Sequence, residues 1–154
     1  MDLNPDAPRY LSPDVQFIRQ DCSQPWPVGE ASLDVIFTSN FFEHLPDKAA
    51  LGRTLDQAPR ALRQGGRLVA MGPNIKLVPG SYWDFWDHYL PLTESSLAEA
   101  LENRSFHIAR TEPAFLPYTM AGKKPAPLPL IRIYLALPKL WRLIGKQFLV
   151  MAVK

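Results

Sequence analysis

The chain has 154 residues, 47% of them hydrophobic and 21% charged, a length and composition that suit one globular domain with a buried core. Its eight Phe, five Tyr and four Trp exclude a disordered chain, and the single cysteine, Cys22, excludes a disulfide scaffold. One unpaired thiol, a polar N-terminal segment and the lack of any apolar run near ~20 residues favour a cytoplasmic location.

Charge is divided unevenly along the chain. Residues 1–112 carry 15 acidic against 10 basic side chains, a net charge of −5, whereas residues 113–154 carry seven basic and no acidic ones, a net charge of +7. Such asymmetry predicts an acidic or membrane-surface partner for the C-terminal part. Because the larger part is net acidic, the sequence disfavours a nucleic-acid substrate.

The first half of the chain predicts two extended runs and a helix. Residues 15–21 form a short β-type run, and residues 33–38 are apolar and β-branched, which is typical of a buried strand. A turn or short helix is expected at residues 40–44. From Asp47, apolar residues recur every three or four positions, which predicts a helix that ends at the glycine pair 65–66.

Pro59 lies inside this helical pattern and should kink or locally break the helix. Residues 67–71 form the next predicted strand, and an irregular aromatic loop follows at residues 76–92. Thr93 is a suitable N-cap for the next helix.

Two strands are expected near the end of the chain, at residues 106–110 and 147–153, with an apolar segment at residues 128–144 between them. Strands that alternate with helices predict an α/β fold with a sheet of parallel character.

Five short motifs occur in a fixed order between residues 2 and 110. They are Asp2-Leu3-Asn4-Pro5, Gln20-Asp21-Cys22, Leu33-Asp34-Val35-Ile36 with Glu43-His44-Leu45, Ala61 to Val69, and Asp87-His88 followed by Thr93 and Leu97. In this order they resemble the class I S-adenosylmethionine-dependent methyltransferases, the type-11 branch in particular. The resemblance implies a Rossmann-like methyltransferase sheet, mostly parallel with an antiparallel last strand.

The Gly-rich turn of that family has no counterpart in the chain. None of the eight glycines forms a G-x-G, and the family's first strand and helix would lie upstream of Asp2. The resemblance therefore implies a single methyltransferase domain, residues 1–154, that is N-terminally incomplete, with the first strand and helix missing. A basic, apolar insert at about residues 114–146 would precede the last strand.

The resemblance implies S-adenosyl-L-methionine as the cofactor. Asp2 would hold the ribose hydroxyls, Asp21 the adenine amino group, and Cys22 would lie beside the ring, while Asn40 and Phe41 would border the sulfonium. From the residues alone, Asp21 is a carboxylate at the carboxyl end of a strand, where open α/β sheets bind ligands. The alternative is that it is an exposed strand-end acid.

Two histidines are candidate catalytic bases, because a hydroxyl acceptor must lose a proton during methyl transfer. His44 follows a strand close to the expected methyl group, and His88 lies beside Asp87, which can orient it. Structural alternatives remain open for both. Glu43 and His44 can begin a helix and orient its cap, and His88 can stack among the tryptophans of its loop.

Aromatic side chains in a loop at the carboxyl side of a sheet suit an acceptor pocket, because flat rings stack on sugars and aromatic substrates. Glu43, Tyr82, Trp83 and Trp86 are assigned to this pocket, and the alternative is that the rings cap the core. No residues have the spacing of metal ligands, so no metal site is predicted.

Basic side chains gather toward the C-terminus. On one helix, four of them would fall within an arc of about 80°, namely Arg132, Lys139, Arg142 and Lys146. The remaining face is largely apolar and includes Trp141, although Pro138 counts against one continuous helix. Such a segment can contact an anionic membrane at the inner face. The alternative is that it packs over the pocket with its basic side chains solvated.

Two functions remain open at this point. The motif Phe115-Leu116-Pro117-Tyr118-Thr119, followed by Trp141-Arg142 and by Gly145 to Val150, resembles a stretch in methyltransferases of polysaccharide-biosynthesis clusters. This resemblance implies a sugar hydroxyl as acceptor. The first interpretation is therefore an O-methyltransferase that acts on a small-molecule or glycan hydroxyl. The second is a non-catalytic remnant that binds a partner or a membrane surface, and the missing Gly-rich turn favours it.

Overall fold

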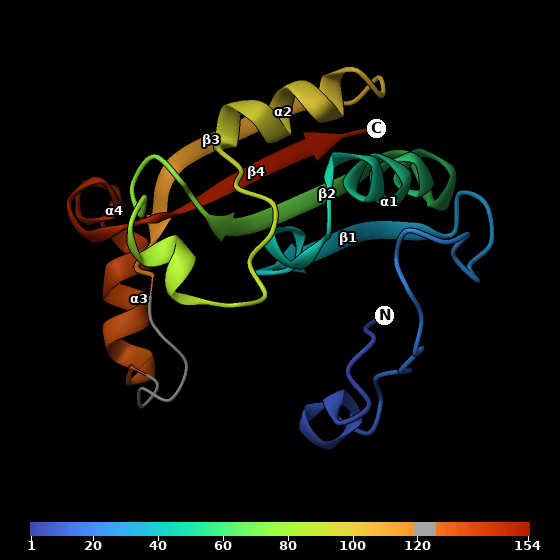
Figure 1. Cartoon of the computed structure of the whole chain (residues 1–154), viewed down its shortest axis with the longest axis horizontal. Coiled ribbons are helices and arrows are strands. Elements are labelled where there is room, and N and C mark those ends of the chain that lie inside the picture. Colours follow the sequence, from blue (N-terminus) through green and yellow to red (C-terminus); the bar gives the residue numbers. More distant parts are fainter. Residues whose placement is uncertain (119–125) are drawn as a thin grey trace.

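The computed structural model describes residues 1–118 and 126–154, and a four-stranded sheet lies at its centre (Figure 1). The strand order is β1-β2-β4-β3, and the strands are β1 (Leu33–Ser39), β2 (Leu62–Pro73), β3 (His107–Leu116) and β4 (Gln147–Val153). β1 and β2 are parallel, whereas β4 is antiparallel to β2 and β3. The expected sheet with an antiparallel last strand is therefore confirmed.

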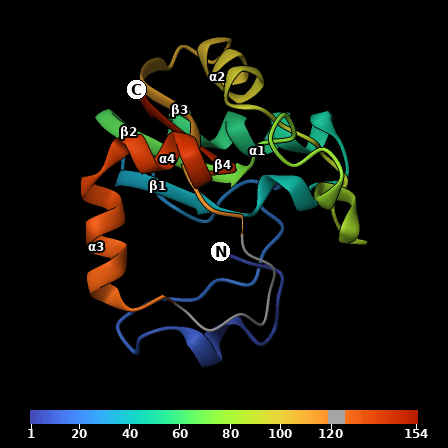
Figure 2. The same cartoon turned by 90° about the vertical axis from the view of Figure 1, so that its left-hand side faces the viewer.

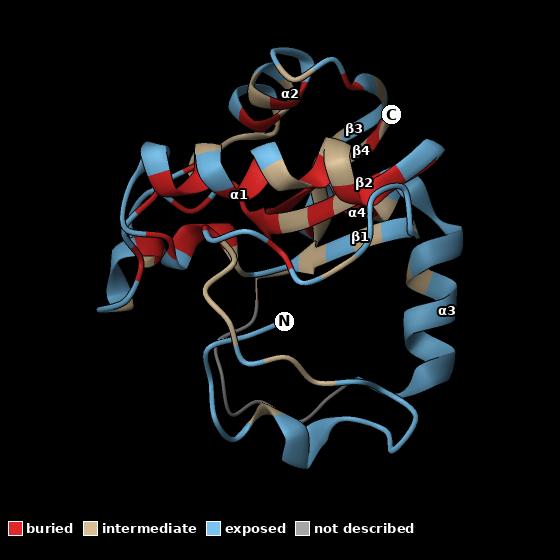
Figure 3. Cartoon of the chain, turned by 90° about the vertical axis from the view of Figure 1, so that its right-hand side faces the viewer, coloured by how far each residue is buried: buried red, intermediate tan, exposed pale blue. Residues whose placement is uncertain are grey.

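Four helices lie in the described residues, and two of them, α1 (Lys48–Ala61) and α2 (Glu94–Glu102), form the core together with the sheet. The other two are α3 (Leu128–Ala136) and α4 (Pro138–Ile144), and 3-10 turns lie at Ala7–Tyr10, Phe42–His44 and Ser81–Asp84. α1 and α2 bury Leu55 and Leu97 against Leu68, Phe148 and Val150 of β2 and β4 (Figure 3). Burying one such side chain contributes about 1.5–3 kcal/mol, so this layer carries most of the stability.

Helix α1 begins at an aspartate cap. The Asp47 carboxylate accepts a hydrogen bond from the Ala50 N–H at 2.7 Å and satisfies one free amide of the first turn. Pro59 lies in the last turn, and the helix continues only to Ala61 before β2 begins. The proline therefore coincides with the end of the helix.

The glycine pair at residues 65–66 lies in β2, so the prediction that it ends the helix is wrong. The Gly65 N–H donates to the Lys154 carbonyl and the Lys154 N–H donates to the Gly66 carbonyl, both at 3.0 Å. Gly65 has a φ of 75°, and a Cβ on Gly66 would lie 2.8 Å from the Arg63 carbonyl oxygen. The glycines permit a tight backbone approach within the sheet rather than a helix terminus.

Strand β1 lies at an edge of the described sheet. It pairs with β2 alone. The exposed fraction is 53% for Val35 and 62% for Phe37, so the prediction of a buried strand is wrong. The run at residues 15–21 does not form a strand either: a parallel bridge joins Asp2 to Arg19. This N-terminal segment lies apart from the sheet and is mostly exposed (Figures 1 and 3).

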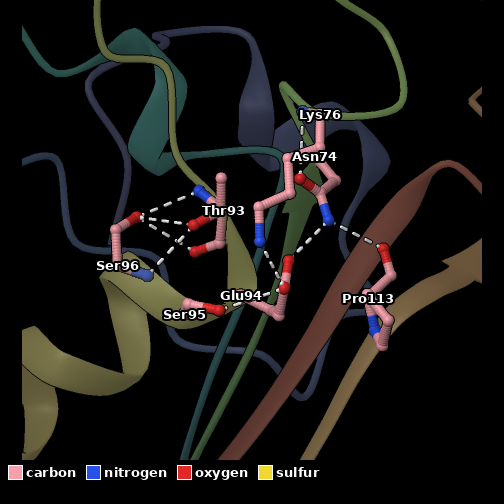
Figure 4. A network of polar contacts seen from close by, with 7 residues as sticks. All are labelled: Asn74, Lys76, Thr93, Glu94, Ser95, Ser96 and Pro113. Carbon is pink, nitrogen blue, oxygen red and sulfur yellow. Dashed lines mark hydrogen bonds and ion pairs between the residues drawn. The ribbon is translucent and has the colours of Figure 1, made fainter.

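Thr93 is the N-cap of helix α2, as predicted. The Thr93 Oγ1 accepts a hydrogen bond from the Ser96 N–H, and the Ser96 Oγ accepts one from the Thr93 N–H, each at 3.0 Å (Figure 4). This capping box satisfies two free amides at once. The strand that follows extends to Leu116, beyond the predicted end at residue 110.

The fully buried Asn74 joins the end of β2 to α2 and β3 (Figure 4). Its Nδ2 donates to the Glu94 Oε2 at 2.6 Å and to the Pro113 carbonyl at 2.9 Å. The Lys76 Nζ pairs with the other Glu94 oxygen at 2.8 Å. Residue 74 also forms a parallel bridge with Leu92, so both ends of the aromatic loop are fixed at this point.

Two helices, α3 and α4, take the place of one basic amphipathic helix. The chain breaks at Pro138, as predicted, and α3 projects away from the sheet on the side opposite α2 (Figures 1 and 2). Arg132 lies on α3, Lys139 and Arg142 lie on α4, and Lys146 follows α4, so the single arc predicted for them does not form. Part of the expected insert, residues 119–125, lies outside the described residues.

Candidate functional site

A groove of about 340 Å³ separates the N-terminal segment from β1 and α1. Three of the predicted cofactor residues line it, Asp2, Cys22 and Phe41, together with the exposed edge of β1. Asp21 and Asn40 adjoin these residues in sequence but are not among the residues that line the groove. The volume lies within the range of small-molecule sites, about 300–1,000 Å³.

Asp21 and Cys22 are held by hydrogen bonds within the N-terminal segment. The Asp21 Oδ1 accepts a hydrogen bond from the Ser23 N–H at 2.8 Å, and this bond lowers the pKa of the carboxyl. The Trp26 Nε1 donates to the Cys22 carbonyl at 2.8 Å. Burial raises the pKa of the Cys22 thiol, which keeps it protonated and unreactive.

Asn40 turns the chain from β1 into the 3-10 turn Phe42–His44. Its φ of 48° lies in the left-handed region, which asparagine tolerates better than most residues, and its N–H donates to the Met71 carbonyl at 3.0 Å. Phe41 is half-buried and its ring lies 5.6 Å from that of Phe42. The turn places Glu43 and His44 directly after the carboxyl end of β1 in the chain.

Glu43 ties this turn to the aromatic loop. Its carbonyl accepts hydrogen bonds from the Tyr89 N–H at 2.8 Å and the Leu90 N–H at 3.1 Å. The side chain is 4% exposed and packs beside Gly72, where a Cβ would lie 3.5 Å from the Glu43 Oε2. Burial raises the pKa of the Glu43 carboxyl to about 7.

The structure pairs Asp87 with His44 and not with His88. The His44 Nδ1 lies 3.0 Å from the Asp87 carbonyl oxygen and 3.2 Å from its Oδ2. Because both partners are acceptors, Nδ1 carries the proton, and the Nε2 lone pair remains available. The side chain is 37% exposed, so it is accessible to a ligand.

His88 is packed among rings, although these rings are not the predicted tryptophans. It stacks on Phe85 with centroids 4.8 Å apart and lies 4.7 Å from the Tyr82 ring and 5.0 Å from that of His44. Burial lowers the pKa of His88, which favours the neutral imidazole. Its Nδ1 is buried and has no hydrogen-bond partner in the described residues.

The predicted acceptor residues separate into a buried and an exposed group. Tyr82 is fully buried beside His88, whereas Trp83 is 56% and Trp86 94% exposed. Tyr118, which was not predicted as a site residue, is half-buried next to this group, with its ring 6.0 Å from that of Phe85. The only signal for it was its place in the motif that resembles the polysaccharide-cluster enzymes.

Helices α3 and α4 are attached to β3 through two aromatic residues. The Trp141 Nε1 donates to the Tyr134 carbonyl at 2.9 Å, and the Tyr134 Oη donates to the Phe115 carbonyl at 2.6 Å. Trp141 is buried, with the Arg110 guanidinium 5.3 Å from its ring, so it does not face solvent as a surface anchor would.

Large apolar side chains on these helices are exposed together. They are Leu128, Leu130, Ile131, Ile133, Leu135, Leu137, Leu143 and Ile144. Arg132, Lys139, Arg142 and Lys146 lie between and beside them in sequence, and we term the exposed side chains of this segment, residues 128–146, the apolar–basic surface. In the part of the chain that the structure describes, no helix has the length and apolar character needed to cross a bilayer.

Comparisons with known proteins show a match to a family model over part of the chain and a shared fold over nearly all of it. Residues 2–70 match the family model of the type-11 methyltransferase domain. A SAM-dependent methyltransferase from Archaeoglobus fulgidus superposes with a TM-score of 0.73 at 20% identity, over 99% of this chain and 74% of that one. Residues 2–70 therefore match the type-11 methyltransferase domain, and the chain as a whole has the class I methyltransferase fold. The cofactor of this family is S-adenosyl-L-methionine.

Other solved structures share the methyltransferase fold. A S-adenosylmethionine-dependent methyltransferase from Mesorhizobium loti gives a TM-score of 0.66 at 16% identity, over 99% of this chain and 78% of that one. A chain of the complex that contains the Haloferax volcanii Trm112 methyltransferase activator gives 0.69 at 19% identity, over 99% and 69%. A search of the curated proteins finds no match. At these identities the structures establish the fold of the methyltransferase domain.

Proposed function

We propose that this methyltransferase domain transfers a methyl group to a hydroxyl of a small molecule or a glycan. The observation that carries the proposal is His44, whose Nδ1 is held by Asp87 while its Nε2 stays available beside the buried Glu43 and His88. A positioned imidazole with an available nitrogen is suited to take the proton of an attacking hydroxyl.

The groove suits the cofactor of the family. It combines the carboxylate-bearing Asp2 with the Phe41 ring and the apolar edge of β1, and Asp21 lies one residue from its wall at Cys22. A nucleoside needs this combination of a charged acceptor for its polar groups and an apolar wall for its base. When bound there, S-adenosylmethionine supplies a methyl group on a positively charged sulfur.

Residues of the chain would remove the hydroxyl proton and bind the acceptor. His44 would take the hydroxyl proton at Nε2, and the Asp87 carboxylate would stabilise the imidazolium that forms. The exposed rings of Trp83 and Trp86 would stack on the flat face of a sugar or aromatic acceptor. Binding energy from these rings would place the hydroxyl close to the reacting methyl group.

Asp21→Ala tests the cofactor part of the proposal. We expect it to weaken the binding of S-adenosylhomocysteine by about 1–3 kcal/mol, roughly 5–150-fold in Kd, through the loss of a charge-assisted hydrogen bond. Isothermal titration calorimetry measures the change. Asp14→Ala, another carboxylate in the N-terminal segment, is the matched control and should bind as the unaltered chain does. An unchanged Kd in Asp21→Ala would place adenine elsewhere, and no binding by the unaltered chain would contradict the proposal.

The apolar–basic surface favours a second candidate function, a peripheral contact with an anionic membrane at the cytoplasmic face. Eight exposed apolar side chains beside four basic ones form a surface that can enter the headgroup region. Residues 113–154 carry no acidic side chain that would repel such a membrane. In a non-catalytic module, membrane binding through this surface would be the whole function. In an enzyme, the same binding would bring the site close to a lipid-linked glycan.

Charge reversal on this surface should weaken binding to anionic vesicles. Each basic side chain near a phosphatidylglycerol surface contributes about 1 kcal/mol. The triple change Lys139→Glu, Arg142→Glu and Lys146→Glu removes about 3 kcal/mol of attraction and should reduce binding by about 100-fold or more. Co-sedimentation with phosphatidylglycerol and with phosphatidylcholine vesicles measures it.

The matched control reverses three basic residues of the N-terminal half: Arg9, Arg19 and Lys48. It has the same net charge and should keep most of the binding. Equal loss in both triple variants, or equal binding to neutral vesicles, would contradict a specific membrane surface.

A further inference from the structure

Three side chains that can ligate a metal converge where the 3-10 turn Phe42–His44 meets the aromatic loop. Glu43, His44 and His88 each offer one ligand atom, and the three atoms lie within 4.8 Å of one another. Glu43 and His88 are 4% and 7% exposed, so two of the three are held in place by packing. The backbone hydrogen bonds from the loop to the Glu43 carbonyl bring these groups together across 44 positions of sequence.

The buried members of this cluster lack partners that a cation would supply. In the described residues no lysine or arginine forms an ion pair with Glu43, whose carboxylate is expensive to bury when it is ionised and unpaired. The buried Nδ1 of His88 also lacks a hydrogen-bond partner among the described residues. One positive ion between these side chains would satisfy both of them.

His44 makes the hydrogen bonds that are typical of a metal-binding histidine. Histidines that bind metals usually donate their second ring N–H to a carboxylate or a carbonyl oxygen, which fixes the ring and its tautomer. The His44 Nδ1 has both partners on Asp87, at 3.2 Å to the Oδ2 and 3.0 Å to the carbonyl oxygen. Asp87, which is not a member of the cluster, therefore fixes the orientation of the His44 ring and of its Nε2 lone pair.

We propose that Glu43, His44 and His88 bind one divalent transition-metal ion of the Zn²⁺ type. Two imidazoles and one carboxylate suit Zn²⁺ and Co²⁺ better than Mg²⁺ or Ca²⁺, and three protein ligands leave a coordination position open. Ligands at about 2.0–2.2 Å from one ion lie roughly 3–4 Å apart, so the cluster must contract slightly. The accessible His44 is the side chain best able to move.

The open position links this site to the acceptor. This step rests on the proposed function: the acceptor oxygen would bind the ion, which lowers the pKa of a bound hydroxyl and so eases loss of its proton. In the metal-loaded domain the ion then replaces the His44 nitrogen as the group that activates the hydroxyl, and the proton passes to solvent.

Titration of the tag-free chain with Co²⁺, after removal of metals with a chelator, tests the proposal. We expect one equivalent of Co²⁺ to bind with visible d–d absorption and without a thiolate band from Cys22. One equivalent of Zn²⁺ should displace it, whereas Mg²⁺ should not. His44→Gln and His88→Gln should lose the absorption, and Asp87→Asn, outside the ligand set, should weaken binding about 10–100-fold.

The control is His107→Gln, because His107 is exposed on β3 and far from the cluster in sequence. It should bind Co²⁺ as the unaltered chain does. No stoichiometric binding by the unaltered chain, or unchanged binding in His44→Gln, overturns the proposal. His44 is the decisive position because its exposure makes misfolding an inadequate explanation for lost binding.

Parallel assays separate this proposal from the proposed function. Methyl transfer that continues undiminished after chelation overturns the role of the ion and leaves the methyltransferase proposal intact. Stoichiometric Co²⁺ binding that His44→Gln abolishes, in a chain that does not bind S-adenosylhomocysteine, supports the metal site and contradicts the proposed function.

Discussion

Replacing His44 by glutamine is expected to lower the rate of methyl transfer by about 10²–10⁴-fold, the usual contribution of a positioned general base. The Asp87 contacts fix the ring through Nδ1 and leave Nε2 as its working nitrogen. Glutamine keeps a polar side chain of similar length but cannot accept the proton. A comparable loss is expected if Nε2 binds an ion, so the prediction holds for either use of this nitrogen.

The measurement is transfer of a labelled methyl group from S-adenosylmethionine to the accepting hydroxyl. The turnover number should fall while the Kd for S-adenosylhomocysteine stays the same, because His44 does not line the groove. His107→Gln should retain the full rate. A His44→Gln rate within about tenfold of that of the unaltered chain would exclude this side chain from the proton step.

Elements with strong local signals were predictable from the sequence. Thr93 caps α2 through contacts that span three residues, and such a cap forms independently of the rest of the fold. The strands at Leu33–Ser39 and Gln147–Val153 follow from runs of apolar and β-branched residues. Pro138 interrupts the C-terminal helices because its backbone has no N–H to donate.

Features that depend on the neighbours of a strand were not predictable. The apolar composition of β1 predicts a buried strand, but Val35 and Phe37 are exposed and only β2 pairs with β1 in the described sheet. The glycine pair at residues 65–66 has the composition of a helix end. It lies in a strand because Lys154, almost ninety positions away, pairs with that backbone.

In the site, too, contacts between sequence neighbours were predictable, whereas contacts between distant segments were not. Glu43 and His44 are neighbours in sequence, and their place after β1 was expected. From their adjacency in sequence, Asp87 was predicted to orient His88. In the structure the Asp87 carboxylate contacts His44 instead, 43 residues away. The fit of Glu43 against Gly72 depends on two elements packing together, so no spacing in the sequence could reveal the metal-ligand cluster.

Replacing Asn74 by alanine is expected to destabilise the fold by about 2–4 kcal/mol. The side chain is fully buried, and its loss leaves the Pro113 carbonyl and one oxygen of Glu94 without their donor (Figure 4). A hydrogen bond of this kind contributes about 0.5–1.5 kcal/mol with a neutral acceptor such as the Pro113 carbonyl and about 1.5–3 kcal/mol with a charged one such as Glu94. Urea unfolding should show a lower midpoint with an unchanged m-value, since the surface exposed on unfolding remains the same.

Ser95→Ala is the matched control for the Asn74 network. The Ser95 Oγ also contacts Glu94, at 3.1 Å, but it is exposed, so its loss should change stability by less than about 0.5 kcal/mol. A loss below about 1 kcal/mol in Asn74→Ala would mean that water replaces the side chain.

Asn74 also closes the loop that carries His88, whereas the groove beside β1 is built from other elements. In the folded fraction of Asn74→Ala, S-adenosylhomocysteine should therefore bind normally while methyl transfer falls. That separation would show that the loop contributes to the acceptor side of the site and not to the cofactor side.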